Sequence, residues 1–214
     1  MKQEDAGQPS AAPMVQKTIE LGEGVRLEMV LIPAGSFEMG GSGGGDDELP
    51  VHKVTIAKPF YLGRYEVTVA QFRRFVEATG YRTTALTTDV ACSVPYFLPD
   101  PVNVSRRHVS WDGSHRRDVD PNEPVVFITP ADALAFCDWL STQEKAVYRL
   151  PTEEEWEYAY RAGTFLRYGF VERPEDAATY AWTDESTPSP TGHWSTHPHP
   201  VGQKQATPFG VFDL

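Results

Sequence analysis

A chain of 214 residues is long enough to bury one sizeable hydrophobic core, which favours a single globular domain. Its hydrophobic fraction of 40% and charged fraction of 23% exclude an intrinsically disordered protein, because disorder requires few apolar residues and a high charge content. The formal net charge of -11 repels phosphate backbones and anionic lipid surfaces, so we expect neither nucleic acid nor a membrane as a partner.

The first 25 residues are expected to form a flexible N-terminal arm, which leaves residues 26–214 for the folded domain. The opening stretch MKQEDAGQPSAAP is polar and acidic, and it lacks the apolar core of a secretory signal peptide. No apolar run in the chain approaches the ~20 residues that a membrane-spanning helix needs. We therefore expect a cytoplasmic protein.

Short strands are predicted at the start of the domain. In residues 26–32, Leu27, Met29 and Leu31 alternate with Val30 and its polar neighbours, which is the pattern of a strand with one buried face. Residues 51–57 show the same alternation, and residues 60–67 follow as an aromatic-rich segment. These two segments are expected to be paired strands.

Two segments lack any regular period and are expected to be irregular. Residues 40–47 are rich in glycine and acidic residues, but they lack the GK[ST] ending of a phosphate-binding loop, which we therefore exclude. Residues 81–123 contain prolines and scattered arginines, and an irregular segment of this length is usually functional.

The first predicted helix begins after Thr68, whose hydroxyl is expected to form a capping box with Gln71. Phe72 and Phe75 share one face of this helix, and Gly80 is placed to adopt the left-handed conformation that ends it.

A second helix is predicted after Thr129, with Pro130 at its first position, where a missing N–H is tolerated. Asp132 and Asp138 are expected to point away from the core. The residues expected to face the core recur at helical spacing: Ala133, Phe136, Cys137 and Leu140.

The third helix is predicted between the N-cap Thr152 and Gly163, with Glu155 closing a capping box. Its buried face is expected to consist of Trp156, Ala159 and Tyr160. Three helices among short strands and long loops predict an α+β fold that is rich in loops.

Candidate reactive residues are few. Cys92 and Cys137 have the spacing of neither a disulfide framework nor a metal site, so Cys137 is expected to be a small buried hydrophobic residue. His193, His197 and His199 could together bind a transition metal, but the neighbouring prolines extend the chain and leave His193 apart unless a turn intervenes. We favour the interpretation without metal.

Seven sequence blocks, taken in order, resemble those of the sulfatase-modifying factor family. They cover most of the chain after the arm, and they are MVLIPAGSFEMG (29–40), PFYLGRYEVT (59–68), GYRT (80–83), PVVFITPADALAFCDWL (124–140), RLPTEEEWEYAYRAG (149–163), HPVG (199–202) and PFGVFDL (208–214). The resemblance implies a C-type-lectin-like α+β fold with little regular structure. It also implies the family's founding activity, formylglycine generation, which is the oxidation of a sulfatase cysteine to an aldehyde.

The resemblance also bears on cofactors. In the family, a segment like PFGVFDL continues into a Gly-Asn-x-Trp-Glu-Trp motif and then into strands that carry paired, copper-binding cysteines. This implies that the closing C-terminal strands and the copper site are absent from the 214 residues, that the chain alone is inactive, and that no catalytic or cofactor-binding residue carries over. Family members also bind calcium, for which Asp184 is the candidate ligand.

Three functional hypotheses follow from this resemblance. The first is an oxidase that acts on a sulfatase-like polypeptide. The second is a non-catalytic module that binds a protein or other ligand through aromatic surface around Trp182 and Trp194. The third is an ergothioneine-type oxidative sulfur-transfer enzyme, which would need an iron-binding domain for which the short arm leaves no room.

A further expectation concerns the surface of the domain. A lectin-like core without its closing strands is expected to expose apolar surface and unpaired strand edges. The sequence leaves the oligomeric state open.

Overall fold

The structure is a computed structural model. The residues that it describes are 16–41, 48–84, 111, 119–164, 166, 171, 173–182 and 198–213. No helix within these ranges is long and apolar enough to cross a membrane.

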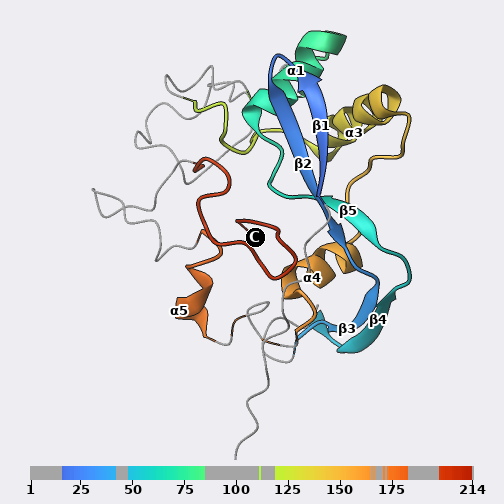
Figure 1. The fold of residues 1–214 in the computed structure, drawn as a ribbon, viewed down its shortest axis with the longest axis vertical. Coiled ribbons are helices and arrows are strands. Elements are labelled where there is room, and N and C mark those ends of the chain that lie inside the picture. Colours follow the sequence, from blue (N-terminus) through green and yellow to red (C-terminus); the bar gives the residue numbers. More distant parts are fainter. Residues whose placement is uncertain are drawn as a thin grey trace, which may run out of the picture.

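Two small antiparallel sheets form the β part of the fold (Figure 1). The three-stranded sheet has the order β1-β2-β5, formed by Gln16–Gly22, Val25–Ile32 and Phe60–Gly63. The second sheet pairs β3 (Gly35–Met39) with β4 (His52–Ile56). The strand pairs within both sheets are antiparallel, which agrees with the predicted α+β class.

Strand β1 corrects the predicted extent of the N-terminal arm. Residues for which the sequence predicts a flexible arm pair with β2, from Gln16 opposite Val30 to Gly22 opposite Val25. Ile19 of this strand is only 2% exposed, although its neighbours Thr18 and Glu20 are polar. A strand with a single buried apolar residue has too little periodicity to be recognised without its partner.

The helices are α1 (Val69–Thr79), α3 (Pro130–Glu144), α4 (Glu153–Arg161) and the short α5 (Pro174–Ala177). The three predicted N-caps, Thr68, Thr129 and Thr152, are confirmed, and each takes part in a complete capping box. Gly80 has φ +66° and ends α1 as predicted.

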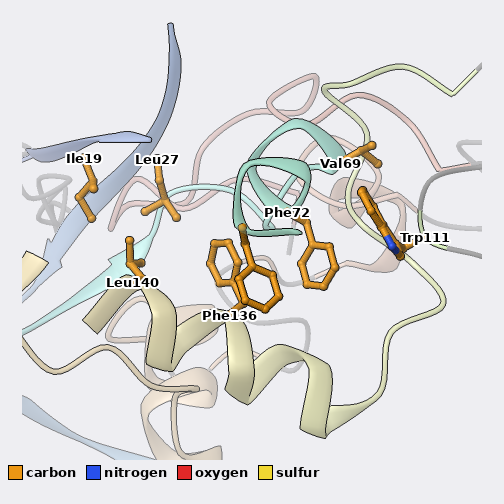
Figure 2. Packing of buried hydrophobic residues seen from close by; sticks show 8 residues of the cluster. Ile19, Leu27, Val69, Phe72, Trp111, Phe136 and Leu140 are labelled. Carbon is orange, nitrogen blue, oxygen red and sulfur yellow. The ribbon is translucent and has the colours of Figure 1, made fainter. Parts of the chain in front are cut away.

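The first hydrophobic core lies between α1 and α3. Figure 2 shows Phe72 of α1 beside Phe136 of α3, with Leu27 of β2 toward one end and Trp111 toward the other. The Phe72 and Phe136 rings stack with their centroids 6.0 Å apart. Burying aromatic side chains of this size stabilises the fold by about 1.5–3 kcal/mol each, so this cluster joins the helices firmly to the three-stranded sheet.

A second core lies on the other side of β2, where Val30 and Ile32 pack with Phe37, Tyr158 and Ala159. Val30 is fully buried, which corrects its predicted place among the polar residues of the strand. The reason is that both faces of β2 are covered, since Leu27 packs in the first core and Val30 in the second, so its apolar residues need not all lie on one face.

The buried face of α4 also differs from the prediction. Tyr158 and Ala159 are buried against β3, whereas Trp156 remains 47% exposed. Helical spacing shows which residues share a face, but the packing partner decides which face becomes buried.

Two charged residues of α4 fasten this helix to the end of β3. The backbone N–H of Gly40 donates to Glu157 Oε1 at 3.0 Å, and Arg161 Nε donates to the same oxygen at 2.7 Å. Arg161 Nη2 also donates to the Gly40 carbonyl at 2.8 Å. Since both side chains are mostly buried, these hydrogen bonds are screened less by solvent than those of a surface ion pair.

We expect Glu157→Gln to lower the free energy of unfolding by about 1–2 kcal/mol, because a neutral amide oxygen accepts from the Arg161 guanidinium more weakly than a carboxylate does. Arg161→Lys should lower the free energy of unfolding by a similar amount, since the single ammonium of lysine cannot replace the two guanidinium nitrogens that donate to Glu157 and to the Gly40 carbonyl. Urea denaturation measures both changes. Unchanged midpoints in both variants would show that the helix is held by apolar packing alone.

Candidate functional site

The candidate site is an apolar groove of about 410 Å³ that lies between the three-stranded sheet, α3 and the beginning of α4. Its lining includes Met29 of β2, Leu62 of β5, Phe136 of α3 and Trp156 of α4. The last described segment closes one side, since Phe212 also contributes to the lining. Figure 1 shows this segment ending near α4.

A smaller pocket of about 240 Å³ shares several lining residues with the groove, among them Met29, Tyr61 and Tyr148. Lys17 Nζ donates to the Tyr148 hydroxyl at 2.6 Å along this side. The two hollows therefore form one continuous apolar surface along β5.

Two carboxylates, Glu66 and Asp213, lie at the groove. Burial raises the pKa of the Glu66 carboxyl; a hydrogen bond from its own backbone amide opposes this effect, and the charge of Asp213 adds to it. Asp213 accepts hydrogen bonds from the backbone N–H groups of Gly202 and Lys204. These bonds hold the end of the described chain against residues 202–204.

Cys137 also lines the groove, but its environment does not suit a reactive thiol. It is half-buried rather than fully buried as predicted, and burial together with the charge of Asp138 raises the pKa of its thiol. Nucleophilic and metal-binding cysteines act as thiolates, which a raised pKa disfavours at neutral pH.

The described residues do not fit the copper site that the resemblance implies. A paired-thiolate site needs two adjacent cysteines, and Cys137 is the free cysteine found in the described ranges. Nor do these ranges contain any group of three or more histidine, cysteine, aspartate or glutamate residues that could hold a metal ion.

Arg149 stands at the rim of the groove and is held by Glu155. Its guanidinium donates to both carboxylate oxygens of Glu155, at 2.6 and 2.7 Å. This interaction lowers the pKa of Glu155, and burial opposes it. The planar bidentate contact orients the loop before α4, which forms part of the groove wall.

Several residues proposed from the sequence lie outside the described ranges: Asp184, Cys92, His193, His197 and Trp194. The calcium ligand therefore stays a prediction. His199 is described, and its ring stacks on Trp182 with centroids 3.8 Å apart. Lys204 Nζ lies 4.2 Å from the centroid of the same Trp182 ring, so this histidine belongs to a packed aromatic and cationic cluster.

The sequence interpretation missed the structural role of Asp132, which is fully buried instead of pointing away from the core. Its carboxylate accepts from Thr129 at the start of α3 and from Tyr81 and Thr84, which follow α1. A signal was present, because Asp132 lies three residues after the predicted N-cap, where a carboxylate can close a capping box.

Comparison with known proteins identifies relatives along nearly the whole chain. The sequence profile of a family described as the sulfatase-modifying factor enzyme 1-like domain matches residues 20–214. A formylglycine-generating enzyme of Mycobacterium tuberculosis is 33% identical over 229 residues, covering 87% of this chain and 70% of the relative. A Bos taurus protein named inactive C-alpha-formylglycine-generating enzyme 2 is 32% identical over 197 residues, covering 82% of this chain and 59% of the relative.

A solved structure agrees with these sequence matches. The structure of PvdO from Pseudomonas aeruginosa superimposes with a TM-score of 0.64 at 28% identity, covering 92% of this chain and 70% of that one. The matched relatives are thus longer than this chain, which spans 59% of the bovine protein and 70% of the mycobacterial one.

Proposed function

The chain belongs to the sulfatase-modifying factor enzyme 1-like family, and we propose that its protein is a formylglycine-generating oxidase. Such an enzyme oxidises the side-chain carbon of a cysteine in a polypeptide, so that an aldehyde replaces the thiol. The observation that carries the proposal is the 33% identity, over 87% of the chain, to an enzyme with this name. The proposal includes a sulfatase-like polypeptide as substrate, copper as the metal and a C-type-lectin-like scaffold.

Within this proposal, the described residues supply scaffold rather than reacting groups. Phe72 and Phe136 join the two largest helices, and Glu157 joins α4 to β3. Cys137 is placed in this scaffold as a packing residue, because its thiol is half-buried and its pKa is raised.

The test uses the protein at the full length that its gene encodes. It is incubated with a peptide carrying a sulfatase cysteine motif, copper and oxygen, and the peptide is analysed by mass spectrometry. We expect conversion of the cysteine to formylglycine. The Cys137→Ala variant should convert the peptide equally well, because this thiol takes no part in the reaction.

The 214 residues alone are expected to leave the peptide unchanged, since the described thiol is unsuited to oxidation chemistry. If the folded full-length protein converts no peptide, it would group with the relative named inactive. This result would favour the non-catalytic binding module instead. Loss of conversion in folded Cys137→Ala would contradict the scaffold role of that cysteine. The cytoplasmic location stays a prediction, which cell fractionation tests.

A further inference from the structure

The last described segment, residues 207–213, follows a course that its own contacts prescribe. The N–H of Gly210 donates to the Thr207 carbonyl at 2.7 Å, which closes a turn. Val211 is only 3% exposed and packs in the second core. Asp213 has φ +56°, a left-handed conformation that is uncommon outside glycine and that persists where the surrounding contacts enforce it. The segment therefore leaves the second core in a defined direction.

Arg64, the residue that follows β5, contacts this segment with both its backbone and its side chain. Its carbonyl accepts from the Phe212 N–H at 3.0 Å. Its guanidinium carbon lies 4.9 Å from the centroid of the Phe212 ring and 5.4 Å from that of the Tyr65 ring. A cation over an aromatic face at this distance is attracted by the quadrupole of the ring. Arg64 thus holds both the backbone and the ring of Phe212.

The guanidinium is itself held by β2. Arg64 Nη1 donates to Glu28 Oε2 at 2.8 Å, and the Arg64 backbone N–H donates to the Glu28 carbonyl at 2.9 Å. The two side chains are 25% and 36% exposed, so water screens their ion pair only in part. A planar guanidinium can pair with a carboxylate through its edge and cover an aromatic ring with its face. Arg64 therefore connects β2 and the end of β5 to the last described segment.

Tyr65 completes this contact from a second side. Its ring packs against Phe212 with centroids 5.0 Å apart. A Cβ at Gly202 would lie 2.8 Å from Cε1 of the same ring, so the backbone of residue 202 is already close to it. The Gly202 N–H in turn donates to Asp213. Phe212 therefore cannot shift without disturbing residues on both sides of the Tyr65 ring.

We propose that Arg64 is a positioning residue of the proposed oxidase, which acts through Phe212 to place residues 207–213 and the part of the groove wall that they form. The inference rests on the proposed function. The thiol of Cys137 is unsuited to reaction and the described ranges hold no group of metal ligands, so these ranges contribute by placing other groups. Phe212 and Asp213 both line the groove. A misplacement of about 1 Å slows a catalysed step by about a hundredfold, so their position matters for the rate.

Arg64→Met keeps the length of the side chain but removes its charge and its donors. In full-length protein, kcat for conversion of the sulfatase-motif peptide should fall by about tenfold while KM stays within about twofold, because the geometry of the site changes more than peptide binding does. Amide hydrogen exchange at Phe212 should become about tenfold faster in the same variant. Exchange within α1 should not change, since only a local opening is affected.

Two further variants separate this role from a general loss of stability. Arg64→Lys keeps the charge without the planar group, so it should lose only about threefold in kcat, and it provides the test if Arg64→Met does not fold. Arg73→Met is the matched control, because Arg73 is an exposed arginine of α1, and it should leave both kcat and exchange unchanged.

Three results would overturn the proposal: unchanged kcat in folded Arg64→Met, unchanged exchange at Phe212, or a rise in KM with kcat unaltered. If the unmodified full-length protein converts no peptide, the proposed oxidase is refuted instead. The exchange measurement does not depend on catalysis, so it still decides whether Arg64 holds Phe212 in place.

Discussion

Asp132→Ala is expected to lower the free energy of unfolding by about 3–5 kcal/mol, because it removes the acceptor shared by several buried donors. The side chain is fully buried. Its Oδ2 accepts from the Thr129 N–H at 2.7 Å, and its Oδ1 accepts from the Tyr81 hydroxyl and the Thr84 N–H, both at 2.9 Å. Alanine would leave all three donors without this partner and would release the chain after α1 from α3.

The acid dependence of stability provides a second measure of this carboxylate. Burial by itself raises the pKa of Asp132, but hydrogen bonds from Thr129, Thr84 and Tyr81 outweigh it and leave the pKa below its ordinary value. The folded state therefore binds the proton less tightly than the unfolded state does. The resulting stabilisation is complete above the unfolded pKa of about 3.9 and is lost as the pH falls through the lower folded pKa.

Urea denaturation from neutral pH to about pH 3 measures both effects. The stability difference between the unmodified chain and Asp132→Asn should stay constant near neutral pH and shrink in acid. Asp138→Ala serves as the control, because Asp138 lies exposed on the same helix, and it should change stability by less than about 0.5 kcal/mol. If the Asp132 and Asp138 variants behave alike, the buried network contributes no stability.

Gly35→Ala is expected to lower the free energy of unfolding by about 2 kcal/mol through overpacking. A Cβ at this position would overlap the Tyr158 hydroxyl and would lie 3.2 Å from Cζ of the same ring. The ring cannot easily withdraw, because it packs between Phe37 and Phe209 at centroid distances of 5.4 and 5.5 Å.

A second substitution tests the cause directly. Tyr158→Phe removes the overlapping oxygen, so the Gly35→Ala/Tyr158→Phe double variant should recover most of the stability lost by Gly35→Ala. Thermal and urea unfolding of the four proteins in this cycle give the coupling between the two positions. Additive losses would show that the clash is relieved elsewhere, for example by movement of β3.

Helix ends could be predicted from the sequence because their chemistry is local. The hydroxyl of Thr68, Thr129 or Thr152 reaches an N–H only three residues away, and all three caps form as predicted. The ordered sequence blocks were equally informative, since the family they indicate is the one whose profile matches residues 20–214.

The candidate site could be predicted only in part, because its residues come from distant parts of the chain. Met29, Trp156 and Phe212 meet in the groove only after the three-stranded sheet, α4 and the last described segment have packed. Trp156 is exposed, although the helical spacing predicted it in the buried face of α4. The sequence does not show which residues of the helix its packing partner covers.

The sequence by itself therefore determined the features that depend on short separations along the chain: the caps, the α+β class and the family. Only the tertiary structure decided that β1 pairs with β2, that Asp132 is a buried acceptor and that an apolar groove follows β5. The physical reason is that burial and hydrogen-bond satisfaction are properties of surfaces brought together by folding, and a residue's neighbours in sequence do not specify those surfaces.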